Sequence, residues 1–203
     1  MNRKIKTLGL ALLTTLALTA VMASTASANF TSSAAHTVLS GSQVESHKFT
    51  AGTGIGAINC TTVSFSGTAA ASSEPTQVVT PTYANCKDSL GRTVDVNTSS
   101  AEYMFTSTAG KGLFHIIGGH ITITVTGSTN CVITITAQNN KNNVAYTQEG
   151  NHLKYATGTN NIHTHISGGG FACGTESKTC TNGTYTGTTL MKGDGGVAKI
   201  SVH

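Results

Sequence analysis

The sequence predicts an all-β protein, an antiparallel β-sandwich of the immunoglobulin-like type or a similar one. Three observations predict this fold: many short segments alternate apolar and polar residues, Gly-rich turns separate them, and no amphipathic helix is recognisable after residue 28. The composition agrees, because charged residues make up 10% of the chain, Trp is absent and only two Pro occur. Such a composition excludes a charge-rich disordered tail, a collagen, a coiled coil and a helix-dominated enzyme.

Residues 1–28 are predicted to be a secretory signal peptide. Three basic residues near the start precede an apolar stretch over 8–22, and small residues at positions 26 and 28 form a cleavage site before Asn29. The basic residues are Arg3, Lys4 and Lys6. We therefore expect a protein that is secreted or resides in the cell envelope, with no membrane insertion after cleavage.

Cleavage would also remove most of the net positive charge. The full chain has 12 Lys and Arg against 8 Asp and Glu, and the leader holds three of the basic residues. The remaining basic residues are scattered singly, whereas nucleic-acid binding needs them clustered. We therefore expect no nucleic-acid partner.

A hairpin gives the strongest strand signal. Apolar residues alternate with Thr over 121–126, a short turn follows, and the alternation resumes over 131–136. Because side chains alternate faces along a strand, Cys131, Ile133 and Ile123 are expected to point into the core. The other expected strands are 91–97, 101–106, 143–148, 161–167, 183–189 and 196–202.

A nine-residue pattern occurs twice in the chain. Residues 60–68 and 180–188 both follow C-T-x-x-[S/T]-[F/Y]-[S/T]-G-T. The match indicates two related β modules, although a chain rich in Thr and Gly can also produce it by coincidence. We place the modules at 29–112 and 113–203, with the boundary at the Gly-Lys-Gly turn of residues 110–112.

Five stretches form a further set of motifs: Pro81–Cys86, Glu102–Phe105, Asn130–Gln138, Val144–Thr147 and Thr181–Gly187. In these motifs the chain resembles a group of uncharacterised exported bacterial β-proteins, often present as several paralogues per genome. The resemblance implies an exported β fold and brings no known activity, substrate or catalytic residue. Members of the group carry further Cys near the positions of Ala101 and Ile117, which implies that Cys131 has lost a partner.

Five Cys remain after the leader, and export makes disulfides the default over metal thiolate sites. Spacing alone leaves their connectivity open. We favour Cys60–Cys86 and Cys173–Cys180, because each pair lies within one module. Cys131 is then a free, buried thiol that behaves as a small core residue rather than a nucleophile.

His163 and His165 are the strongest metal-ligand candidates. Residues i and i+2 of a strand project from the same face, so both imidazoles could reach one Cu or Zn ion. A site needs a third ligand, for which His115, His120 and His152 are available. The alternative is that both side chains are polar residues on a solvated strand face.

Signatures of catalysis are weak. No G-x-S-x-G motif occurs, and only three Asp are available to orient a catalytic His. We assign no catalytic residue and no cofactor.

Rows of Thr suggest a different kind of site. Alternating Thr in three segments would place hydroxyls in rows on outward faces, which could order water or contact a polysaccharide. Thr is also simply a good strand former, and the absence of Trp disfavours stacking on sugars. The rows are Thr122/Thr124/Thr126, Thr134/Thr136 and Thr184/Thr186/Thr188.

We therefore expect an exported, non-catalytic β-sandwich protein that acts as a binding or cell-envelope-associated module. One alternative is a metal-binding protein that uses His163 and His165. The other is a glycan or ice binder that uses the outward Thr rows.

Overall fold

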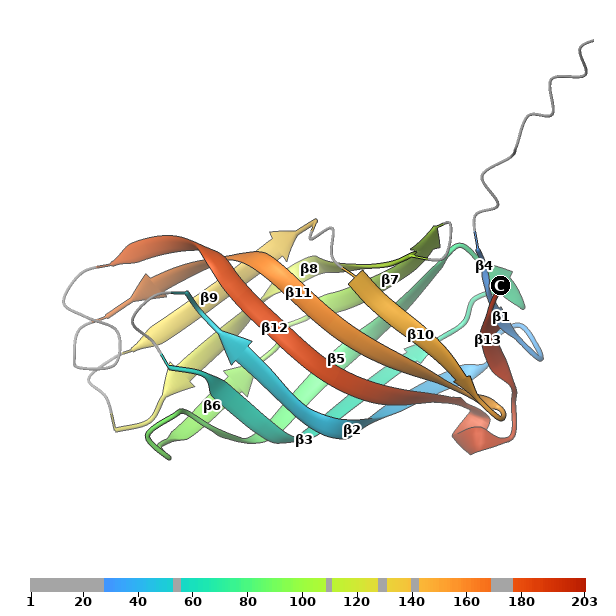
Figure 1. The fold of residues 1–203 in the computed structure, drawn as a ribbon, viewed down its shortest axis with the longest axis horizontal. Helices are drawn as coiled ribbons and strands as arrows, with labels where there is room; N and C mark the ends of the chain where they lie inside the picture. The colour runs from blue at the N-terminus through green and yellow to red at the C-terminus, as the bar shows by residue number, and fades with distance from the viewer. Residues whose placement is uncertain (1–27, 53–55, 109–110, 128–130, 140–142, 169–176) are drawn as a thin grey trace, which may run out of the picture.

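The main feature of the computed structural model is an antiparallel β-barrel with eight strand positions in its wall (Figure 1). The structure describes residues 28–52, 56–108, 111–127, 131–139, 143–168 and 177–203. The barrel strands are β2 (Val38–Thr50), β3 (Ile58–Thr68), β5 (Thr76–Lys87), β6 (Thr93–Asn97), β7 (Glu102–Thr108), β8 (Lys111–Val125), β9 (Val132–Gln138), β10 (Asn143–Glu149), β11 (His152–Ser167) and β12 (Lys178–Gly193).

Two of the eight positions are each filled by a pair of short strands. β6 and β7 both lie between β5 and β8, and β9 and β10 both lie between β8 and β11. The break between β6 and β7 faces a kink in β8, where Gly118 and Gly119 have φ of +62° and +44°. A Cβ on Gly119 would collide with the backbone of Ser99 and Ser100, so only glycine permits this close approach.

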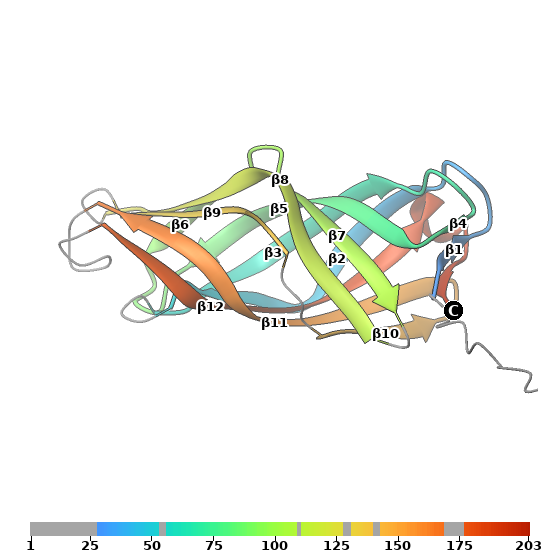
Figure 2. The same cartoon turned by 90° about the horizontal axis from the view of Figure 1, so that it is seen from above.

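The prediction of a β-sandwich is wrong, because β12 pairs with β2 and closes the sheet on itself (Figure 2). Alternation of apolar and polar residues is the same in a sandwich and in a barrel, since both have one buried and one solvated face. Whether the first and last strands pair is a separate matter that local patterns do not determine. Strands from both predicted modules, 29–112 and 113–203, build this one barrel.

A small three-stranded sheet lies at one end of the barrel, on the right in Figure 1. It consists of β1 (Phe30–Ser32), β4 (Ser73–Glu74) and β13 (Ile200–Val202), and a short 3₁₀ turn, η1 (Asp194–Gly196), precedes β13. The Phe30 ring packs against Tyr146 and Tyr155 inside the barrel, with centroids 5.4 and 6.3 Å away. β1 therefore plugs this end of the barrel with an aromatic side chain.

The interior of the barrel is filled by its own side chains, as an eight-stranded barrel allows. The predicted hairpin is confirmed as β8 and β9: Ile123 lies opposite Ile133 and Ile121 opposite Ile135, and all four are buried. Cys131 is also buried, as predicted. In the part of the chain that the structure describes, no helix is long and apolar enough to span a membrane.

Candidate functional site: a buried His–Tyr cluster

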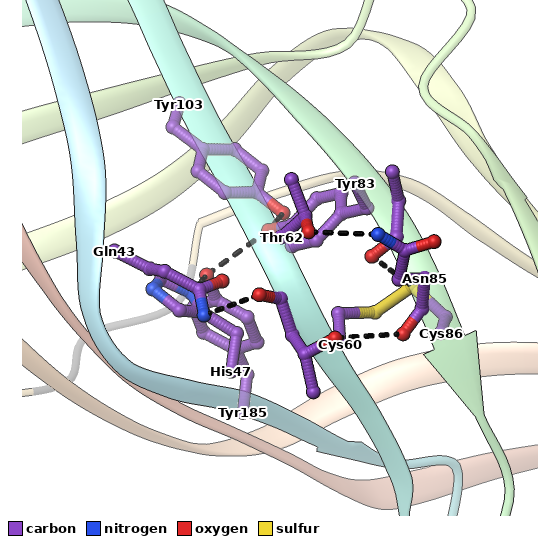
Figure 3. The surroundings of a disulfide bond; sticks show 11 residues. Gln43, His47, Cys60, Thr62, Tyr83, Asn85, Cys86, Tyr103 and Tyr185 are labelled. Atoms are coloured by element: carbon purple, nitrogen blue, oxygen red, sulfur yellow. Dashed lines mark hydrogen bonds between the residues drawn. A yellow bond between two sulfur atoms is a disulfide. The ribbon is translucent and has the colours of Figure 1, made fainter.

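The most unusual feature of the interior is a cluster of four polar rings, which we call the His–Tyr cluster (Figure 3). It consists of His47 from β2, Tyr83 from β5, Tyr103 from β7 and Tyr185 from β12. The Tyr185 hydroxyl lies 2.5 Å from His47 Nδ1 and accepts a hydrogen bond of 3.0 Å from the Tyr83 hydroxyl. The Tyr83 and Tyr103 hydroxyls are 2.6 Å apart. The cluster therefore links four strands across the interior.

His47 points inward on the same side of β2 as Leu39 and Gly41, although the strand between them is irregular. Leu39 and Gly41 face the interior with the expected period of two, and His47 and Phe49 do so again after an irregular stretch. Register shifts occur on both edges of β2 in this stretch. The His47 ring lies over Gly187 of β12, where any Cβ would collide with it. The backbone of two strands thus shapes the space for this one side chain.

Burial holds all four rings of the cluster in their neutral forms. Loss of hydration lowers the pKa of His47 to about 4, although a hydrogen bond to the backbone of Thr188 opposes this shift. Burial likewise raises the pKa values of Tyr83, Tyr103 and Tyr185 above the ordinary value. At neutral pH the cluster is an uncharged hydrogen-bonded chain in apolar surroundings.

A small cavity adjoins the cluster. Its free volume is about 30 Å³, which gives room for about two water molecules. The cluster forms its polar side, and Ile121, Ile123 and Ile135 are among the apolar side chains opposite. The hydrogen bonds of the cluster connect the strands around this small cavity.

The predicted disulfide between Cys60 and Cys86 is confirmed. The two residues are direct neighbours on β3 and β5, with Cα atoms 4.0 Å apart, and Cys60 is also the register partner of His47. The disulfide therefore lies beside the His–Tyr cluster (Figure 3). A disulfide of this kind indicates an oxidising, extracellular environment.

Two other cysteine predictions are wrong. Cys180 carries a free thiol and is buried, so it does not form the expected bond with Cys173. Cys131 is disulfide-bonded rather than free. Cys173 itself lies outside the described residues. Sequence spacing does not show which cysteines lie on neighbouring strands, so it could not choose among the pairings.

His163 and His165 both lie exposed on the outer face of β11, the arrangement that the alternation predicts. His165 Nε2 lies 3.1 Å from the Ser177 hydroxyl. Among the described residues, no group of three or more His, Cys, Asp or Glu is arranged to hold a metal ion. Metal binding at this pair remains a prediction.

The outer wall carries rows of hydroxyl side chains. Thr122 and Thr134 are direct neighbours on β8 and β9, as the Thr rows predict. A larger array, which the Thr rows did not predict, lies on β2, β3 and β5, and we call it the hydroxyl array. Its two rows are Ser40–Ser66–Thr80 and Ser42–Ser64–Thr82. An alternating S-x-S in 40–42 and 64–66 was the available signal.

No family model, no curated protein and no solved structure matches this chain. The resemblance to exported bacterial β-proteins therefore remains a prediction.

Proposed function

We propose that this protein is an exported, non-catalytic binding module that holds a neutral polysaccharide of the cell envelope on its outer wall. The observation that carries the proposal is the hydroxyl array, combined with an interior that its own side chains fill. Ligand binding inside an eight-stranded barrel requires an open lumen. Here the adjoining cavity holds only water-sized molecules, so binding is assigned to the outside.

The geometry of the hydroxyl array suits a neutral polyol. Neighbouring strands lie about 4.8 Å apart and alternate residues about 6.7 Å apart along a strand, so six hydroxyls form a grid on one wall. Five of them are exposed and Thr80 is half-buried, and none of the six carries a charge. Hydroxyls both donate and accept hydrogen bonds, as sugar hydroxyls do. The wall of a barrel is twisted, which favours a flexible polysaccharide over the planar surface of ice.

Export is supported by two features. The N-terminal residues have the pattern of a signal peptide, and the Cys60–Cys86 disulfide fits an oxidising compartment. The absence of catalysis is supported by the His–Tyr cluster, whose groups hydrogen-bond one another in a space that excludes substrates.

Co-sedimentation with insoluble neutral polysaccharides, chitin and a β-glucan, tests the proposal. We expect the mature protein to bind at least one of them and Ser64→Arg, in the middle of the array, to reduce binding at least tenfold. Thr147→Arg on β10, exposed on another part of the wall, is the matched control and should bind as the wild type does. Absence of binding to every polysaccharide, or equal binding by both variants, would contradict the proposal.

A further inference from the structure

We propose that the seam between β2 and β12, which closes the barrel, is locked by the neutral His47 side chain and opens when that side chain takes up a proton. This inference concerns the interior of the barrel and does not depend on the proposed polysaccharide site.

The backbone ladder is incomplete at this seam. The pairing of β2 with β12 shifts register twice, between Thr186 and Thr188 and between Thr188 and Thr189. On its other edge, the pairing of β2 with β3 is interrupted between Ser42 and His47. This part of β2 therefore has fewer regular ladder bonds on either side than the rest of the strand.

The His47 side chain supplies bonds across the seam at this point. Its Nδ1 is 2.5 Å from the Tyr185 hydroxyl, and its Nε2 is 3.3 Å from the Thr189 hydroxyl. It also hydrogen-bonds the backbone of Thr188. All three partners belong to β12, so one side chain of β2 connects the two closing strands where their ladder is irregular.

A neutral His47 fits the hydrogen bonds around it. Tyr83 donates to the Tyr185 hydroxyl, which leaves the Tyr185 proton available for an imidazole Nδ1 that accepts. Nε2 then carries the imidazole proton. A protonated ring would donate from both nitrogens. Either the Tyr185 proton then loses its acceptor, or Tyr185 and Tyr83 reverse direction and the Tyr103 proton points toward the largely apolar cavity.

No charged group among the described residues compensates a proton on His47. The titratable side chains facing the ring are Tyr83 from β5 and Tyr185 from β12, with Tyr103 of β7 behind them. β3 contributes the Phe65 ring and the disulfide-bonded Cys60. Glu45 and Lys48 of β2 are exposed, and the Glu45 carboxylate accepts a hydrogen bond from the Thr188 hydroxyl.

While the seam is closed, the spaces beside the ring are small and largely apolar. The ring lies against Gly187 on one side, and the Phe65 and Tyr83 rings are 5.8 and 6.4 Å away. A proton on His47 is therefore accommodated by separating β2 from β12, which returns the imidazole to water.

The pH range follows from the two protonation states. Burial lowers the pKa of His47 to about 4 in the closed barrel, and the ordinary value in water is 6.5. Because the open seam binds the proton more strongly, the closed form loses stability as the pH falls from 6.5 to about 4. Above this range the closed form keeps its full stability. The equilibrium constant for opening should rise about 100-fold between pH 7 and pH 4.

Hydrogen exchange of backbone amides between pH 7 and pH 4, corrected for intrinsic rates, tests this device on the mature protein. We expect opening of residues 41–49 and 184–191 to rise about 100-fold, while amides of the β8–β9 hairpin show no such rise. His47→Gln, which stays neutral, should make the seam insensitive to pH. His163→Gln removes an exposed imidazole and should leave the wild-type response unchanged.

A second measurement keeps the proposal testable if His47→Gln fails to fold. Titration of the wild-type His47 ring by NMR should show a pKa well below 6.5, with protonation accompanied by exchange at the seam. A ring that titrates near 6.5 in a closed barrel would overturn the proposal. So would acid-induced opening that is equal in all strands, or an unchanged pH response in a folded His47→Gln variant.

Discussion

The two copies of the repeated motif lie on either side of β2, yet their corresponding residues make different contacts. Residues 60–68 are in β3 and residues 180–188 are in β12, and both strands pair with β2. In both copies the Cys and the aromatic residue are buried and the Thr after the Cys is exposed. The motif thus specifies which side chains point inward, and the neighbouring strands decide what each of them does.

Three positions of the motif show the difference. Cys60 is bonded to Cys86, whereas Cys180 is a free thiol. Phe65 offers only its ring, whereas the Tyr185 hydroxyl is in the middle of the His–Tyr cluster. Gly67 faces the backbone of β5 and Gly187 faces the ring of His47. The three differences are separable by mutation.

The largest expected effect is at the Cys position. Replacing Cys60 and Cys86 together by Ala should lower the free energy of unfolding by about 3 to 4 kcal/mol, because the bond closes a sequence separation of 26 residues. Cys180→Ala deletes one buried sulfur atom and should cost about 1 kcal/mol. Chemical denaturation of the oxidised proteins measures both.

Thiol labelling provides the control for this comparison. In denaturant without reductant, peptide mapping should show label on Cys180 and none on Cys60, Cys86 or Cys131. Equal losses of stability for the two copies, or label on Cys60, would show that the copies do not differ in this way.

The second effect is at the glycine. A Cβ on Gly67 would lie 2.5 Å from the backbone oxygen of Val78, and one on Gly187 would collide with the His47 ring. Each Gly→Ala change should therefore cost about 1 to 3 kcal/mol by overpacking. Only the clash at Gly187 is with a side chain that can be removed.

A double-mutant cycle distinguishes the two glycines. In a His47→Ala background, Gly187→Ala should cost almost nothing further, whereas Gly67→Ala should keep its full cost. Denaturation midpoints and slopes of the four variants give the coupling. Additive costs for Gly187→Ala and His47→Ala would contradict the placement of the His47 ring over this glycine.

The sequence predicted the regions where alternation is strict. β8 and β9 alternate Ile and Thr without interruption near the hairpin, so their register and their inward residues follow from the period of two. β2 was missed, because its alternation is interrupted over 42–46 and its inward set includes Gly41 and His47. Local polarity cannot show that His47 points inward, since a polar side chain between Ser46 and Lys48 does not stand out as a core residue.

The closed sheet and the site depend on contacts between distant residues. The pairing that makes the barrel joins residues such as Phe49 and Tyr185. The predicted inward position of Cys131 was correct, since it needed only the period of the strand. The predicted free thiol at Cys131 was wrong, because its bonding state depends on which strands lie beside its own. The face to which a side chain points follows from local alternation, whereas its bonding partner depends on which strands are neighbours.

The smallest expected effect is at the aromatic position, where Tyr185→Phe makes the second copy resemble the first. The change keeps the ring and removes one hydroxyl, so packing is preserved. Because that hydroxyl serves both His47 and Tyr83, its loss leaves a buried ring nitrogen without its closest partner. We expect a cost of about 1 to 2 kcal/mol in chemical denaturation at pH 7.

Tyr103→Phe is the matched control, because its hydroxyl bonds only Tyr83 among the side chains of the cluster, and it should cost less. Hydrogen exchange at pH 7 should show faster opening of the β2–β12 seam in Tyr185→Phe than in Tyr103→Phe. Equal costs and equal seam exchange for the two variants would mean that the Tyr185 hydroxyl does not connect the closing strands.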